Sequence, residues 1–225
     1  MKIKTTTSAA ALTAGGLLLA AGGLMHPQAE SEASYEQALA GMFGASAWTA
    51  SHALTMAGFL VISFAMAGLL RAVADGWSMP ARVAGWAVVA GAGLAAVESL
   101  PHLLASSEGD ALLRGDATPL TDLHALLQTV STPAFGLAVA ALALTTARDR
   151  ALGNGRIAAA VATVGGIAFG LAGPLMAVTK DPALSPLFAG AAALALWIVL
   201  AGARTTRRLR EDATAQGMHS AHATA

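Results

Sequence analysis

Four histidines could form a metal or haem site, because each lies at the end of an apolar segment long enough to cross a membrane. They are His26, His52, His102 and His124. A neutral imidazole is among the commonest metal ligands, and ionisable side chains inside a membrane default to functional sites. Glu98 lies well inside an apolar segment, four residues before His102 and therefore on the same helix face. The pattern predicts one shared site, with Glu98 as a ligand, a hydrogen-bond partner of a ligand or a proton relay.

Haem b and copper are the two cofactors that suit this set of residues. Two haems side by side would use the four histidines as axial ligands. This arrangement, with histidines at matched depth on neighbouring helices, resembles that of b-type cytochrome subunits. Those subunits usually place haems toward both leaflets, whereas here all four histidines are expected on one side. A single metal centre would instead use His52, His102, His124 and Glu98, and the thioether of Met56 would favour copper. With 0 Cys, the chain can form no thiolate site and no covalent c-type haem.

A polar stripe on the segment that begins near His124 supports a second hypothesis. His124, Gln128 and Thr132 recur every four residues, so this face should contact other helices rather than lipid. In a small transporter or channel, the stripe and Glu98 would line the path. In the plainest interpretation, the histidines only tolerate the membrane interface and Met56 fills apolar space. An accessory membrane subunit without chemistry of its own is the third hypothesis.

The pattern T-x-x-H-A-L occurs twice, at residues 49–54 and 121–126. It places His52 and His124 at equivalent positions near the start of two apolar segments, and in both copies the threonine suits a helix N-cap. The repeat predicts two helical hairpins in the same orientation, related by an axis along the membrane normal.

Composition indicates what must position these residues. The 225-residue chain is 56% hydrophobic and only 12% charged, whereas a soluble domain carries about 25% charged residues. A helix needs about 20 apolar residues to cross a bilayer. We therefore predict an all-α integral membrane protein of about six transmembrane helices in three hairpins, forming a single domain over residues 1–205. The expected spans are residues 9–25, 48–70, 83–105, 120–147, 157–179 and 184–203.

The basic residues predict that both termini are cytoplasmic, because short cytoplasmic loops are rich in Lys and Arg. Only Arg114 and Lys180 would then lie outside. The other eleven would lie inside: Lys2, Lys4, Arg71, Arg82, Arg148, Arg150, Arg156, Arg204, Arg207, Arg208 and Arg210. Residues 206–225 are expected to form a disordered cytoplasmic tail whose arginines meet anionic lipid. The first span has an alternative as a cleaved signal peptide, although Pro27 disfavours cleavage nearby.

Other functions lack a signal in this sequence. The net charge is +0, which gives no basic field to attract nucleic acid. There is no phosphate-binding loop, nucleophile elbow or H-E-x-x-H motif, and the longest loops, residues 27–47 and 106–119, are too short to fold alone. We expect a multi-pass protein of the cell membrane that contacts lipids. Another membrane protein is a candidate partner.

Overall fold

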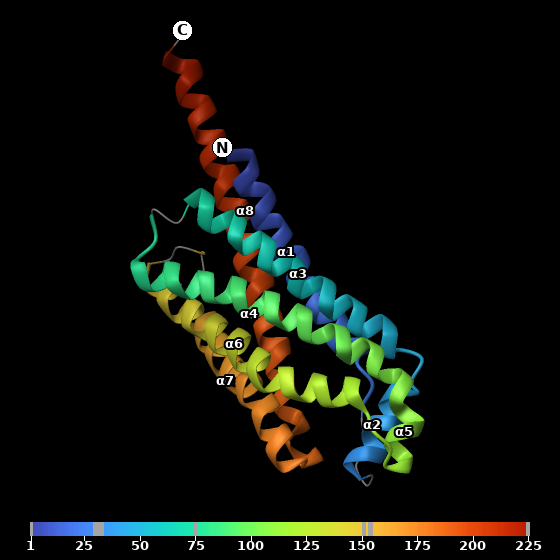
Figure 1. Ribbon diagram of the computed structural model, residues 1–225. Helices are drawn as coiled ribbons and strands as arrows, with labels where there is room; N and C mark the ends of the chain where they lie inside the picture. The colour runs from blue at the N-terminus through green and yellow to red at the C-terminus, as the bar shows by residue number, and fades with distance from the viewer. Residues whose placement is uncertain (1, 29–33, 74–75, 150–151, 153–154, 224–225) are drawn as a thin grey trace.

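The computed structural model describes residues 2–28, 34–73, 76–149, 152 and 155–223, which form helices and turns and, within these ranges, no strand. The elements in chain order are α1 (Lys2–Met25), α2 (Tyr35–Phe43), α3 (Trp48–Val73), α4 (Met79–Leu104), η2 (Ala105–Glu108), α5 (Gly109–Arg114), α6 (Pro119–Asp149), α7 (Arg156–Thr179), η3 (Pro182–Ala189) and α8 (Gly190–Ala223). The all-α prediction is confirmed (Figure 1).

Six of these helical stretches in the described part are long and apolar enough to cross a membrane, as predicted. They are Thr5–Met25, Trp48–Ala72, Met79–Arg114, Pro119–Ala147, Arg156–Thr179 and Ala183–Ala215. The third is longer than the predicted 83–105 because η2 and α5 continue α4 without a break. The fifth stops where Lys180 adopts a left-handed conformation (φ 49°) that ends a helix.

The six long helices pack in a closed ring. Each of α1, α3, α4, α6, α7 and α8 packs against the next, and α8 packs against α1. The three predicted hairpins are therefore neighbouring pairs within this ring. Large apolar side chains fill the centre, and Ile62, Phe135 and Leu142 are completely buried.

Glycine allows a close approach between α6 and α7. A Cβ atom on Gly136 would lie 2.9 Å from the backbone nitrogen of Gly170, and one on Gly166 would collide with the carbonyl oxygen of Gly136. Small faces of this kind drive helix association in lipid, where apolar burial gives no advantage. The Gly166-x-x-x-Gly170 spacing thus serves packing within the chain.

Short helices form a cap over one end of the ring, opposite the end that carries both termini (Figure 1). We call α2, η2 and α5 the cap. Leu39 and Phe43 of α2 pack with Ala105 of η2 and Trp48 of α3 in a small apolar cluster separate from the main core. Ser34 starts α2 with a capping box, in which its side chain accepts from the Gln37 backbone N–H and the Gln37 side chain accepts from the Ser34 backbone N–H. The long loops, predicted to be too short to fold alone, are partly helical and pack on the ring.

The C-terminal segment differs from the predicted disordered tail over residues 206–225. Helix α8 continues to Ala223, and residues 224–225 lie outside the described residues. Thr205 and Ala201 are buried near the start of this extension, and Arg207 pairs with Glu211 one turn on, at 3.5 Å. Such a pair stabilises a helix by about 0.2–0.5 kcal/mol. The prediction of a disordered tail rested on polarity alone and did not include this contribution.

Candidate metal centre

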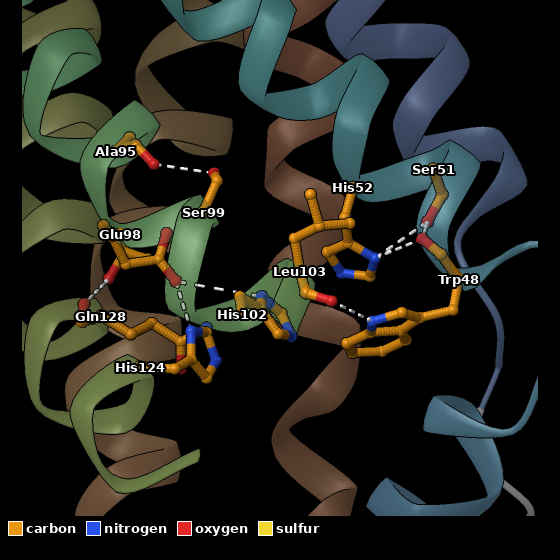
Figure 2. Close-up of polar contacts among 11 residues, drawn as sticks. Trp48, Ser51, His52, Ala95, Glu98, Ser99, His102, Leu103, His124 and Gln128 are labelled. Atoms are coloured by element: carbon orange, nitrogen blue, oxygen red, sulfur yellow. Dashed lines mark hydrogen bonds and ion pairs between the residues drawn. The ribbon is translucent and has the colours of Figure 1, made fainter. Parts of the chain in front are cut away.

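The four predicted histidines meet beneath the cap, although each comes from a different segment. His26 follows α1, and His52, His102 and His124 lie on α3, α4 and α6. The ring centroids form a row, 5.0 Å from His26 to His52, 4.3 Å to His102 and 3.6 Å to His124. His52 and His124 are buried. The predicted convergence is confirmed, and Figure 2 shows three of the rings side by side.

Glu98 lies at the His124 end of this row. Its Oε1 atom is 2.5 Å from Nδ1 of His124 and 3.9 Å from Nδ1 of His102, one helical turn along α4. The Glu98 side chain is 9% exposed. One ligand atom from each of these three residues lies within 4.8 Å of the others. A buried carboxylate whose ion-pair partners are imidazoles is a costly arrangement that a cation would stabilise.

His52 has one ring nitrogen held and the other left open. Its Nδ1 atom is 2.8 Å from the carbonyl oxygen of Trp48, and because that oxygen can only accept, Nδ1 carries the proton. In neutral imidazole Nε2 is then an acceptor with a free lone pair. This Nε2 atom is buried and has no hydrogen-bond partner among the described residues. A backbone carbonyl on one nitrogen and an open second nitrogen is the usual environment of a metal-binding histidine.

His26 repeats this arrangement at the outer end of the row. Its Nδ1 atom donates to the Pro27 carbonyl oxygen at 2.8 Å, which leaves Nε2 as the acceptor. Burial lowers the pKa of His26 below its ordinary value, and the Pro27 hydrogen bond opposes that shift. His26 is half-buried, so it joins the enclosed histidines to the surface of the molecule.

Trp48 organises the row, and the sequence analysis did not select it. Its ring lies 3.9 Å from the ring of His52 and 4.9 Å from that of His102, and its Nε1–H donates to the Leu103 carbonyl oxygen at 3.4 Å. The residue is 1% exposed. A tryptophan four residues before His52 must share its helix face, and that spacing was a usable signal.

Glu108 fixes the start of α6, which carries His124. Its carboxylate accepts from the backbone N–H groups of Leu120 and Thr121, both at 2.9 Å, and from the Thr121 hydroxyl at 2.8 Å. The predicted N-cap role of Thr121 is therefore wrong, because α6 begins at Pro119 and Thr121 donates instead of accepting. Thr49 likewise lies inside α3, which begins at Trp48.

The chain matches no family model, no curated protein and no solved structure. Function must therefore be argued from the chemistry of the site. Two imidazoles and a carboxylate, all enclosed, could hold a metal ion. An ionised Glu98 carboxylate would attract a cation to this group.

The remaining predicted site residues lie outside this group. Thr132 is buried and faces α7, where a Cβ atom on Gly173 would collide with its hydroxyl and lie 3.0 Å from Cγ of Gln128. The polar stripe thus faces another helix, as predicted, and its residues Gln128 and Thr132 pack against α7. Met56, one turn along α3 from His52, packs against the main apolar core. The tail histidines at 219 and 222 have side chains outside the described residues.

Proposed function

We propose that this membrane protein binds a divalent transition-metal ion, Cu²⁺ or Zn²⁺, through Glu98, His102 and His124. One observation carries the proposal, namely the enclosed Glu98 carboxylate whose ion-pair partners are two imidazoles. His52 would supply a fourth ligand through its open Nε2 atom. Imidazole suits both ions, and three histidines with a carboxylate complete a four-coordinate site.

An unpartnered ring nitrogen of His52 supports this assignment. Buried polar groups are nearly always hydrogen-bonded, and each exception needs an explanation. Among the described residues, the buried Nε2 atom of His52 has no hydrogen-bond partner, whereas Oε1 of Glu98 and Nδ1 of His124 contact each other at 2.5 Å. A metal ion would use the lone pairs of this cluster and offset the cost of burying the Glu98 charge.

The packing of the rings favours a metal ion over haem b. A bis-imidazole haem needs two rings on opposite faces of the macrocycle, each pointing a nitrogen at the iron. His102 and His124 instead stack on each other with an interplanar angle of 24° and a centroid distance of 3.6 Å. A metal ion bound at the edges of the two stacked rings needs less rearrangement than a macrocycle inserted between them.

His26 provides the entry to the proposed centre. It is half-buried, its ring lies 5.0 Å from that of His52, and its Nε2 lone pair is open. An ion arriving at the capped end would pass from one imidazole to the next along the row. In this proposal His26 affects the rate of loading more than the affinity.

Transport across the membrane receives less support from the bundle. Aromatic rings fill the ring of helices on the side of the cluster away from the cap, with Phe59 5.0 Å from Phe135 and Phe135 6.3 Å from Phe169. Phe135 is completely buried. A path for an ion would need polar groups here, so the geometry favours a centre loaded from the capped side.

The test is metal binding by the full chain, purified in an uncharged detergent and stripped with a chelator. We expect one Cu²⁺ or Zn²⁺ per chain by elemental analysis and calorimetry. Glu98→Gln and His124→Ala should each lower the affinity by at least about 100-fold, because ligand loss exceeds the 10- to 100-fold effect of changing a ligand's hydrogen-bond partner. Affinity should fall as the pH is lowered, since protons compete for the imidazoles.

Two control variants distinguish the proposed site from adventitious binding. Asp122→Asn removes an exposed acid near the start of α6, and a combined change of the histidines at 219 and 222 to alanine removes imidazoles from the tail. Both controls should bind metal as the unchanged chain does. Stoichiometric binding that survives Glu98→Gln, or that is lost in the tail variant, would refute the proposed site. A Soret band in the purified protein would favour haem instead.

A further inference from the structure

An open apolar cleft lies between α7 and α8, far from the histidines and at the end of the bundle that carries both termini. Its volume is about 1140 Å³, and its walls include Ile157, Val161, Leu196, Trp197 and Leu200, with α6 closing the back. Ile157 is 84% exposed and Leu196 54%. In a membrane, a space of this kind is filled by a lipid chain or by another helix.

The cleft is a wedge whose closed end is set by small residues. A Cβ atom on Gly165 of α7 would lie 2.5 Å from Cβ of Ala193 and 2.9 Å from the carbonyl oxygen of Gly190 on α8. The two helices therefore touch at Gly165. The side chains of Leu196 and Leu200 then line the space as the helices diverge toward the termini.

Positive charge lies at the open end of the wedge. Arg156 and Arg204 both line the cleft, at the first residue of α7 and on the last part of the apolar stretch of α8. Gly155 precedes α7 and provides no side-chain cap for its first N–H groups. Uncapped N–H groups and the helix dipole favour an anion at this position, and a guanidinium pairs well with phosphate.

We propose that this wedge, lined by Arg156 and Arg204, is a binding site for one anionic phospholipid. The phosphate would lie between the two guanidinium groups and the start of α7, and an acyl chain would run along Trp197 toward Gly165. From Ala193 to Arg204 the helix rises by about 16 Å at 1.5 Å per residue, close to the 15 Å or so of half a hydrocarbon core. Both arginines are on the side predicted to be cytoplasmic, where anionic lipids are enriched.

Native mass spectrometry of the full chain in an uncharged detergent tests the site. Phosphatidylglycerol and phosphatidylcholine with identical acyl chains are the two probes. We expect one phosphatidylglycerol to bind with a clear preference, and Arg156→Gln combined with Arg204→Gln to weaken it by about 30-fold, from the usual effect of two membrane-surface arginines. Arg71→Gln combined with Arg82→Gln is the matched control, because these arginines lie on the same predicted side and away from the cleft.

Fluorescence quenching then locates the acyl chain. Phosphatidylglycerol with brominated acyl chains should quench the tryptophan emission of the protein. Trp197→Phe should remove the saturable part of that quenching. Equal binding of the two lipids, or an unchanged preference in the Arg156 and Arg204 variant, would overturn the proposal in favour of ordinary solvating lipid. A dimer that loses its stability when Ile157 and Leu196 are changed to alanine would also overturn it, since a second chain would then occupy the wedge.

Discussion

Glu108 should stabilise the start of α6 and, through it, the position of His124. Its carboxylate accepts three hydrogen bonds, from two backbone N–H groups and the Thr121 hydroxyl. Glu108→Ala removes the carboxylate that accepts all three hydrogen bonds, and with it the favourable charge at a helix N-terminus. The two backbone N–H groups are part-buried, and the Thr121 residue is 7% exposed, so its hydroxyl loses its acceptor in a poorly hydrated place.

The expected cost is about 2 kcal/mol, from about 1 kcal/mol for loss of an N-cap and a similar amount for the buried hydroxyl. Hydrogen exchange measured by mass spectrometry in nanodiscs reports this as local opening. Amide exchange in residues 120–126 should accelerate by about 30-fold, and exchange in the first turn of α7 should not change. Glu108→Gln keeps one acceptor oxygen and should have roughly half the effect in free energy.

Asp110→Asn is the matched control, since Asp110 is an exposed acid on the adjacent α5. If Asp110→Asn accelerates exchange at residues 120–126 as much as Glu108→Ala does, general loss of negative charge explains the result. The specific role of Glu108 would also be refuted by unchanged exchange in Glu108→Ala. Metal affinity measured in the same variants would show how far the start of α6 controls His124.

Three further predictions follow from other parts of the chain. Burial, Glu36 and Asp122 raise the pKa of Tyr35. The stabilising effect of the neutral phenol is therefore present below pH 10 and is lost as the pH rises through the raised pKa. Because the chain has 1 Tyr, the phenolate absorbance of the native protein should titrate above pH 10, and its midpoint should return to about 10 in denaturant. Gly166→Val should lower stability by roughly 2–3 kcal/mol in a thermal unfolding assay, because its Cβ meets the Gly136 carbonyl, whereas Gly23→Val, where nothing lies within 4 Å, should be nearly neutral. A reporter fused after Arg208 should behave as cytoplasmic and one inserted near Glu108 as external, and the reverse at either position would contradict the charge argument for orientation.

The transmembrane helices could be predicted because apolar length alone decides them. The cap could not, because α2 and α5 are 9 and 6 residues long, and isolated helices of that length are marginal in water. Their stability comes from the packing of Phe43 and Trp48 with Ala105, which joins segments far apart in the chain. Sequence periodicity contains no information about such contacts. The polar composition of residues 206–225 predicted disorder, whereas helix α8 continues to Ala223 and includes the Arg207–Glu211 pair.

The residues of the candidate site could be predicted from the sequence, but most of the contacts among them could not. Matched positions at the ends of the spans indicated that His52, His102 and His124 share a depth, and the ring formed by their helices brings them together. The spacing of Glu98 from His102 indicated a shared helix face, but its shortest contact is with His124 on another helix. The hydrogen bond that sets the protonated nitrogen of His52 depends on the local backbone at Trp48, which residue types do not specify.

The closed ring of helices has a consequence for assembly in the membrane. All four proposed ligand residues come from α3, α4 and α6, which are made in succession and pack against one another in chain order. This part of the bundle can therefore form while synthesis continues. The seam between α1 and α8 joins the first helix to the last, so it can close only after nearly the whole chain has been inserted. Until then, the faces of α1 and α8 around Thr13 and Gly202, which pack closely in the finished ring, are open to lipid or to the insertion machinery. The final closure should therefore be a distinct late event in biogenesis, sensitive to substitutions at Gly202 that leave the histidine cluster intact.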